Sequence, residues 1–169
     1  SSTNWLSSQL IMANFTRKGN LNKNFVPTIE EIKIITQFQS IIQKDYKLIR
    51  CTETMLNKSI IDVSGQLREL LKISGIINFE EVKQGIKNKV LKNVGIIITP
   101  DDCIATKVSF YRPDSKEGDP RFWPYGAGKY FQKDLLLMIT VSNGNLVFIP
   151  IIGTHKILNQ IQIRFASNN

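Results

Sequence analysis

Strand-like segments in the second half of the chain constrain the fold more than any other feature. Over residues 104–111, Ile, Thr, Val and Phe alternate with Ala, Lys, Ser and Tyr, which gives one apolar face and one polar, basic face. This period of two is typical of a half-buried β-strand. Two apolar runs, 135–141 and 145–152, flank Asn143-Gly144, and Asn-Gly between such runs predicts a β-hairpin. Two further strands are predicted, at 94–99 and 161–165.

The first half of the chain predicts helices. Thr28 lies three residues before Glu31, which is the spacing of a capping box at the start of a helix. Isoleucine and phenylalanine then recur every three or four residues, so we expect an amphipathic helix that runs to about Lys44. A second helix is expected over residues 66–72, and a third begins at Asn78.

These patterns indicate one domain over residues 1–169 with an α+β fold, in which a predominantly β core carries a helical insertion at about 29–93. No apolar run reaches the roughly 18 residues of a membrane-spanning helix, and no secretory signal is visible. We therefore expect a cytoplasmic protein that does not enter a membrane. Because the chain begins with Ser and both ends are small and polar, we expect a domain excised from a longer protein.

The charge of the chain indicates an anionic partner. The net charge is +8 and the pI is about 9.6, a balance that favours binding to nucleic acid. The first 29 residues contain no Asp or Glu. The segment from Lys107 to Lys133 contains six basic residues and only three acidic ones. Residues 83–92 are also basic, and we interpret them as a solvated connector.

Two polar segments carry the residue types that bind duplex DNA. Arg, Lys, Asn and Gln read base edges in the major groove, and basic and hydroxyl groups hold phosphates. The first segment is the loop 16–24, and the second is the aromatic segment 111–125 with the polar strand face that leads into it. The candidate DNA-binding residues are Arg17, Lys18, Asn20, Asn22, Lys23, Asn24, Lys107, Ser109, Tyr111, Arg112, Asp114, Lys116, Asp119, Arg121, Trp123 and Tyr125.

The basic members of this set divide into two expected roles. Arg112 and Arg121 are candidates for bidentate contacts to guanine, each worth roughly 1–3 kcal/mol of discrimination between bases. Arg17, Lys18 and Lys107 are candidates for phosphate contacts.

The acidic and aromatic members each have two interpretations. Asp114, Glu117 and Asp119 either accept hydrogen bonds from cytosine amino groups or form salt bridges with the two arginines of their loop. Phe122 and Trp123 are more often core anchors at the start of a strand than base contacts.

Catalytic and metal-binding motifs are absent from the sequence. It contains no P-loop, dinucleotide fingerprint, zinc-protease helix or EF-hand loop. Cys51, Cys103 and His155 do not have the spacing of metal ligands, so we expect two reduced, part-buried thiols. We expect no cofactor.

The catalytic alternative is a magnesium-dependent nuclease. Such an enzyme needs clustered carboxylates for the metal and a nearby lysine, and Asp114, Lys116, Glu117, Asp119 and Asp134 supply these groups. Most of them lie in a loop bounded by Pro and Gly, which holds metal geometry less well than a rigid strand end. We therefore expect a binding module without catalytic activity of its own.

Four segments carry a resemblance to a known family. They are Ser109-Phe110-Tyr111-Arg112-Pro113, the run from Lys116 to Trp123, the run from Asp134 to Met138, and Asn143-Gly144. Over about 94–165 the chain resembles the DNA-recognition pseudobarrel of bacterial restriction endonucleases, a group that is similar to the EcoRII effector domain and to the plant B-three-type domain. The nearest likeness is to the N-terminal specificity domain of a LlaJI-type, McrB-related restriction subunit.

The resemblance implies a fold and a function. The fold would be an open seven-stranded pseudobarrel with two arms in the major groove, at 16–24 and at 111–125. The domain would bind a short, specific site in double-stranded DNA without a metal, and cleavage would belong to other domains or subunits of a restriction complex. Two alternatives stay open beside the nuclease: a module that binds RNA, and one that binds an acidic protein.

Overall fold

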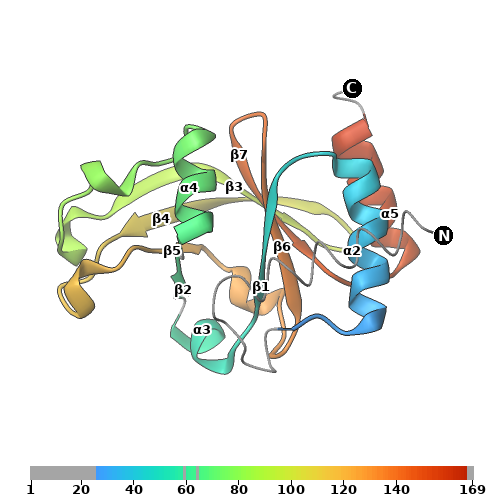
Figure 1. Ribbon diagram of the computed structural model, residues 1–169, viewed down its shortest axis with the longest axis horizontal. Coiled ribbons are helices and arrows are strands. Elements are labelled where there is room, and N and C mark those ends of the chain that lie inside the picture. The colour runs from blue at the N-terminus through green and yellow to red at the C-terminus, as the bar shows by residue number, and fades with distance from the viewer. Residues whose placement is uncertain (1–25, 59, 64, 167–169) are drawn as a thin grey trace.

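The computed structural model describes residues 26–58, 60–63 and 65–166. A seven-stranded sheet with the strand order β1-β6-β7-β3-β4-β5-β2 forms its centre and curls into an open half-barrel (Figure 1). Neighbouring strands are antiparallel except β3 and β7, which are parallel. The predicted α+β fold with an open seven-stranded pseudobarrel is therefore confirmed. The strands are β1 (Tyr46–Arg50), β2 (Ile61–Asp62), β3 (Val90–Ile98), β4 (Cys103–Tyr111), β5 (Arg121–Pro124), β6 (Leu136–Ser142) and β7 (Asn145–Pro150).

Helices cover both faces of the sheet. The capping box at the start of α2 is confirmed, because the Thr28 hydroxyl accepts a hydrogen bond from the Glu31 backbone and the Glu31 carboxylate accepts one from the Thr28 backbone. Asn78 caps only a short 3-10 turn, η2 (Phe79–Glu81). Within the described residues, no helix is both long and apolar enough to span a membrane. The helices are α2 (Ile29–Ile42), α3 (Glu53–Lys58), α4 (Gly65–Ile73) and α5 (His155–Ile161).

Two hydrophobic cores lie on opposite faces of the sheet. On β3, Ile96 and Ile98 pack with α2 and α5, which lie side by side in Figure 1, whereas Ile97 faces the core beneath α4. The apolar runs of β6 and β7 alternate between the two cores in the same way, which explains why these strands are apolar on both faces. Inside the half-barrel, four rings contact one another in a row: Phe79, Phe110, Phe122 and Phe148.

The strand predicted at 161–165 is wrong. This segment ends α5 and continues as a π-helical turn, η6 (Gln162–Ala166). The Thr154 hydroxyl caps the start of α5, and Ile157, Ile161 and Phe165 then recur every four residues as a buried stripe. Ile163, which completed the apparent strand alternation, is 71% exposed. The helical period therefore prevails over the strand period in this segment.

The segment 29–93 contains the helices α2, α3 and α4, as the predicted helical insertion requires, but it is not wholly helical. It contains β1, β2 and the first residues of β3, which pair with β6, β5 and β4. β1 and β2 are the outer strands of the sheet. This segment therefore builds both edges of the half-barrel.

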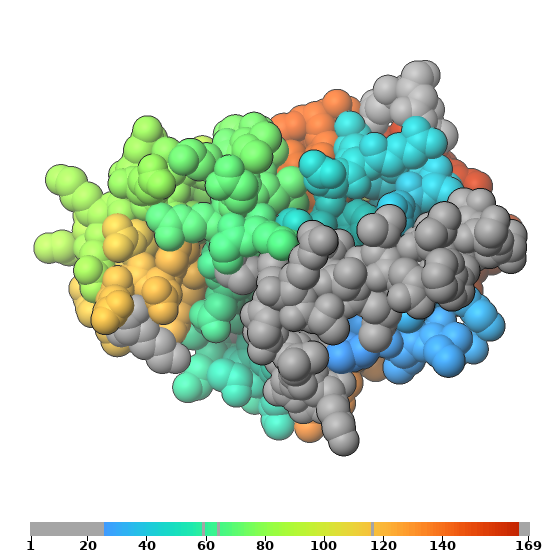
Figure 2. Space-filling view, in the orientation of Figure 1, coloured from blue at the N-terminus to red at the C-terminus, as the bar shows by residue number. Residues whose placement is uncertain are grey.

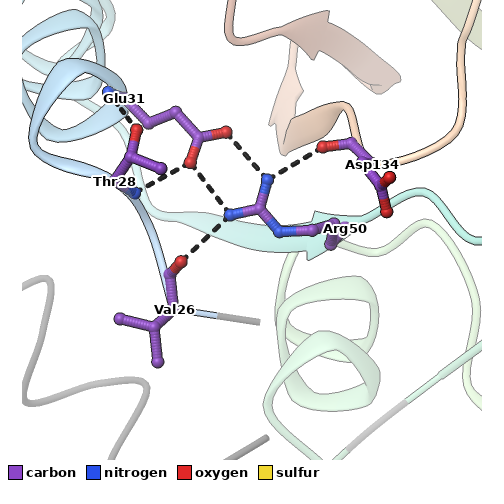
Figure 3. Close-up of polar contacts among 5 residues, drawn as sticks. All are labelled: Val26, Thr28, Glu31, Arg50 and Asp134. Carbon is purple, nitrogen blue, oxygen red and sulfur yellow. Dashed lines mark hydrogen bonds and ion pairs between the residues drawn. The ribbon is translucent and has the colours of Figure 1, made fainter. Parts of the chain in front are cut away.

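A partly buried ion pair joins α2 to the edge strand β1 (Figure 3). Arg50 at the end of β1 donates two hydrogen bonds to the Glu31 carboxylate, with N–O distances of 2.8 and 2.9 Å. The same guanidinium donates to the backbone carbonyls of Val26 and Asp134. The side chains of Arg50 and Glu31 are 10% and 17% exposed. One guanidinium therefore ties together the start of α2, the end of β1 and the turn before β6.

The Arg50 network lowers the pKa of the Glu31 carboxyl. Burial alone would raise this pKa, but hydrogen bonds from Arg50 and the Thr28 backbone, together with the positive charge of Arg50, outweigh burial. The pKa of Glu31 therefore lies below its ordinary value, and the carboxylate stays ionised in the folded protein.

Both cysteines are free thiols, as predicted. Cys51 is fully buried at the end of β1, and burial raises the pKa of its thiol to about 12 against the opposing effect of the Arg50 charge. Cys103 at the start of β4 is half-buried, and burial also raises its pKa. Thiolates are the reactive form of cysteine, so neither position favours reactivity.

Candidate nucleic-acid interface

The loop 112–120 is fixed to the segment 82–89, and the two lie side by side at one end of the molecule (Figure 2). Arg112 donates from Nε to the Gly118 carbonyl at 2.9 Å and from Nη1 to the Val82 carbonyl at 3.2 Å. In return, the Gly85 backbone donates to the Arg112 carbonyl at 2.7 Å. Arg112 therefore holds the loop 112–120 against the segment 82–89 through these hydrogen bonds. Its guanidinium is engaged within the fold, which argues against its predicted role as a guanine contact.

Arg121 is also engaged within the fold. Its Nε lies 3.3 Å from a carboxylate oxygen of Asp62 on the neighbouring strand β2, and its side chain is only 12% exposed. The geometry is that of an ion pair without a hydrogen bond, because the buried Nε has no hydrogen-bond partner in the described part of the chain. Arg121 therefore joins β5 to the sheet edge, which argues against a bidentate guanine contact.

The predicted salt bridges inside this loop are wrong. Arg112 binds backbone carbonyls, and Arg121 pairs with a residue outside the loop. The acidic residues Asp114, Glu117 and Asp119 are exposed. Across residues 26–58, 60–63 and 65–166, no three His, Cys, Asp or Glu side chains form a group that can hold a metal ion. The carboxylates on which the nuclease alternative depends therefore do not assemble a metal site among themselves.

The outer face of β4 and β5 gathers several candidate residues around one open depression. Strand register places Ser109 opposite Trp123 and Tyr111 opposite Arg121. The Tyr125 backbone donates to the Lys107 carbonyl at 2.8 Å, which continues the pairing by one residue. The depression has a volume of about 370 Å³ and is lined by Ile86, Lys89, Ser109, Tyr111, Trp123, Tyr125 and Gly126.

The lining of this depression combines aromatic, polar and basic groups. Tyr125 is 44% exposed, whereas Trp123 is 5% exposed and belongs to the hydrophobic core. The core-anchor interpretation of Trp123 is therefore supported, and only part of its side chain reaches the depression. Lys89 and Lys107 are both exposed, and Lys107 lies two residues before Ser109 on the same face of β4. We call this surface the β4–β5 face; it comprises the lining residues and Lys107.

The loop after β5 shapes the open side of the depression. Gly126 adopts a left-handed conformation with φ of 73° and begins the 3-10 turn η5 (Ala127–Lys129). This conformation favours glycine over residues with a side chain. The turn reverses the chain directly after Tyr125, whose carbonyl accepts a hydrogen bond of 2.6 Å from the Thr106 hydroxyl. The backbone of Tyr125 is thus held by hydrogen bonds to the Lys107 carbonyl and the Thr106 hydroxyl, while its ring remains partly exposed.

Other candidates lie elsewhere or outside the described residues. The whole predicted N-terminal arm falls outside them, and for Lys116 the description covers only its backbone position in η4 (Lys116–Gly118). The candidates that the structure brings together are Lys107, Ser109, Tyr111 and Tyr125, with part of Trp123. The candidates outside the described residues are Arg17, Lys18, Asn20, Asn22, Lys23 and Asn24.

Three residues of the β4–β5 face were not predicted from the sequence. Ile86, Lys89 and Gly126 all line the depression. Lys89 lies in the basic stretch 83–92, which we interpreted as a solvated connector. Its positive charge was the only feature of the sequence that could have indicated a place in the site. Its approach to the depression depends on the pairing of β3 with β4, in which Val90 lies opposite Phe110. A pattern within one segment does not reveal such long-range pairing.

Comparisons of the chain with protein-family models, with curated proteins and with solved structures find no significant match.

Proposed function

We propose that this chain is a sequence-specific, double-stranded DNA-binding domain that serves as the target-recognition module of a restriction system. In this proposal the domain acts in the cytoplasm, binds without a metal, and leaves cleavage to other domains or subunits. The proposal draws on the open seven-stranded pseudobarrel, on the net charge of +8, and on the composition of the β4–β5 face.

The observation that carries the proposal is the convergence of candidate residues at the β4–β5 face. Ser109 and Tyr111 from β4 and Tyr125 from the end of β5 share one depression with Lys89. Lysines bind phosphates, and hydroxyl and aromatic groups contact bases. None of the residues that line the depression is acidic, so its local charge favours a polyanion.

The structure changes the roles that we assign within this proposal. Lys89 and Lys107 are now the phosphate contacts, while Tyr111 and Tyr125 contact bases or sugars. Arg112 becomes a positioning residue, because its hydrogen bonds hold the loop 112–120 against the segment 82–89. The exposed Asp119 and the backbone-placed Lys116 remain candidates for contacts to DNA.

The experiment that tests this function is selection from a randomised duplex library. The full chain is incubated with the library in EDTA at about 150 mM salt, an ionic strength at which purely electrostatic binding is much weakened. Bound DNA is then recovered and sequenced. We expect one short enriched motif, and intact DNA both in EDTA and with added magnesium.

Each alternative gives a different result in this experiment. A nuclease would nick duplex DNA when magnesium is added. An RNA-binding module would recover no duplex motif and would prefer single-stranded RNA. A module for an acidic protein would recover no motif from the duplex library and would not bind single-stranded RNA. Any of these three results would overturn the proposed function.

A further inference from the structure

The depression on the β4–β5 face has the size of a site for one planar ring. It is open to solvent, and its volume of about 370 Å³ lies near the lower end of small-ligand sites, which span roughly 300–1,000 Å³. It is therefore suited to a single nucleotide and is too small for a helix or a paired duplex. We propose that it holds one unpaired nucleobase of the bound DNA, an inference that rests on the proposed function.

The apolar lining explains why a base suits this depression. Tyr125 is 44% exposed and Ile86 is 61% exposed, and both line the same depression. Single exposed apolar side chains are ordinary, whereas a group of them around a concave site marks a place where a ligand binds. Every nucleobase has a π-face that stacks on an aromatic ring. Tyr111 and Tyr125 supply such rings from two paired segments of the sheet.

The polar lining complements the edge of a base and the phosphate beside it. The Ser109 hydroxyl makes no hydrogen bond within the described residues, and a serine hydroxyl can both donate and accept. Lys89 lines the depression and Lys107 lies on the same strand face as Ser109. An anionic nucleotide therefore fits this lining better than an uncharged or cationic ligand does.

A fully paired base cannot enter the depression without leaving the helix. Extrusion costs unpairing and unstacking energy, and this cost is smallest for a base that is already unpaired. DNA with a single unpaired base should therefore bind more tightly than the same duplex fully paired. The gain should depend on the aromatic ring of Tyr125 and not on its hydroxyl group.

The test compares two short duplexes that both carry the motif recovered from the randomised library, one fully paired and one with a single unpaired nucleotide. Affinities of the full chain for both are measured by fluorescence anisotropy in EDTA at about 150 mM salt. The variants are Tyr125→Ala, which removes the ring, and Tyr125→Phe, which keeps it. Circular dichroism and thermal melting confirm that both variants fold, which we expect because Tyr125 is 44% exposed.

We expect wild type and Tyr125→Phe to prefer the duplex with the unpaired nucleotide, and Tyr125→Ala to lose about 5- to 150-fold of its affinity for that duplex. A 5-iodouracil at the unpaired position should cross-link within residues 86–89 or 109–126 on irradiation. Equal affinity of wild type for both duplexes, or a cross-link only outside residues 86–89 and 109–126, would overturn the inference and leave the proposed function intact. No binding to either duplex would instead overturn the proposed function itself.

Discussion

The Arg50 network gives a quantitative prediction about folding stability. Arg50→Met removes both hydrogen bonds to Glu31 and those to the carbonyls of Val26 and Asp134. Removing one partner of a buried ion pair costs roughly 3–5 kcal/mol, because the other charge stays buried without a partner. Glu31 keeps 17% exposure and its hydrogen bond from the Thr28 backbone. The pair is only partly buried, so we expect a loss between those of an exposed and a buried pair, about 2 kcal/mol near neutral pH.

The loss of stability in Arg50→Met depends on pH through the ionisation of Glu31. The pKa of Glu31 in the folded protein is below its ordinary value of 4.5. The stability that it contributes is therefore fully present above about pH 4.5 and is lost as the pH falls through the folded pKa. In Arg50→Met the carboxyl protonates at higher pH, because burial still raises its pKa while the Arg50 contributions are gone. The difference between wild type and variant should shrink as the pH falls from the pKa of Glu31 in the variant to its lower pKa in wild type.

Urea denaturation followed by circular dichroism measures this effect at about pH 7 and about pH 4. The matched variant is Glu31→Gln/Arg50→Met, which leaves no buried charge. We expect it to be more stable than Arg50→Met alone near neutral pH. A loss below about 1 kcal/mol for Arg50→Met, or a loss that does not change with pH, would refute the reasoning, since it would show that the pair is effectively exposed.

Three further predictions concern backbone space, loop geometry and thiol reactivity. Gly95→Ala should destabilise the fold by about 1–3 kcal/mol in thermal melting, because the added Cβ would lie 2.7 Å from Thr106 Cγ2 and 3.0 Å from the Thr106 carbonyl. An unchanged melting temperature would contradict this close packing of β3 against β4. Gly118→Ala should weaken DNA binding, because Gly118 has φ of 74° and its Cβ would lie 2.9 Å from Gln84 Cδ and 3.2 Å from Arg112 Nη2, which would displace the loop. Unchanged affinity would show that the loop does not contribute to DNA binding. Cys51 should not react with Ellman's reagent until the protein unfolds, because its thiol is fully buried with a pKa of about 12; rapid reaction under native conditions would contradict this.

Local patterns in the sequence predict much of the fold. The alternation over 104–111, the Asn143-Gly144 hairpin and the capping box at Thr28 each depend on neighbouring residues, and each is found in the structure. β1 was missed because its sequence, Tyr-Lys-Leu-Ile-Arg, does not alternate regularly between apolar and polar residues. In the structure all five residues are half-buried, so neither face of this strand is clearly buried or exposed. The segment 161–165 was misassigned because its alternation of apolar and polar residues fits a strand, whereas Ile157, Ile161 and Phe165 also have the spacing of a helix.

The candidate site could be predicted only in part, because some of its residues come together through the pairing of strands that are distant in sequence. Ser109, Tyr111 and Tyr125 belong to paired strands close in sequence, and their clustering follows from one strand register. Lys89 reaches the same depression from the other side through the pairing of β3 with β4. The partners of Arg112 and Arg121 are likewise distant in sequence, so their engagement within the fold left no local signal.

The most direct test of the account compares two matched double variants in binding to duplex DNA. Lys89→Gln/Lys107→Gln removes two charges from the β4–β5 face, whereas Lys83→Gln/Lys133→Gln removes two exposed charges that do not line the depression. Each lost phosphate contact should reduce the slope of log K against log salt by about 0.9, so the first variant should lose about 1.8 in slope together with affinity. The control variant should keep both values near those of wild type. Equal losses in the two variants would contradict a DNA interface at the β4–β5 face.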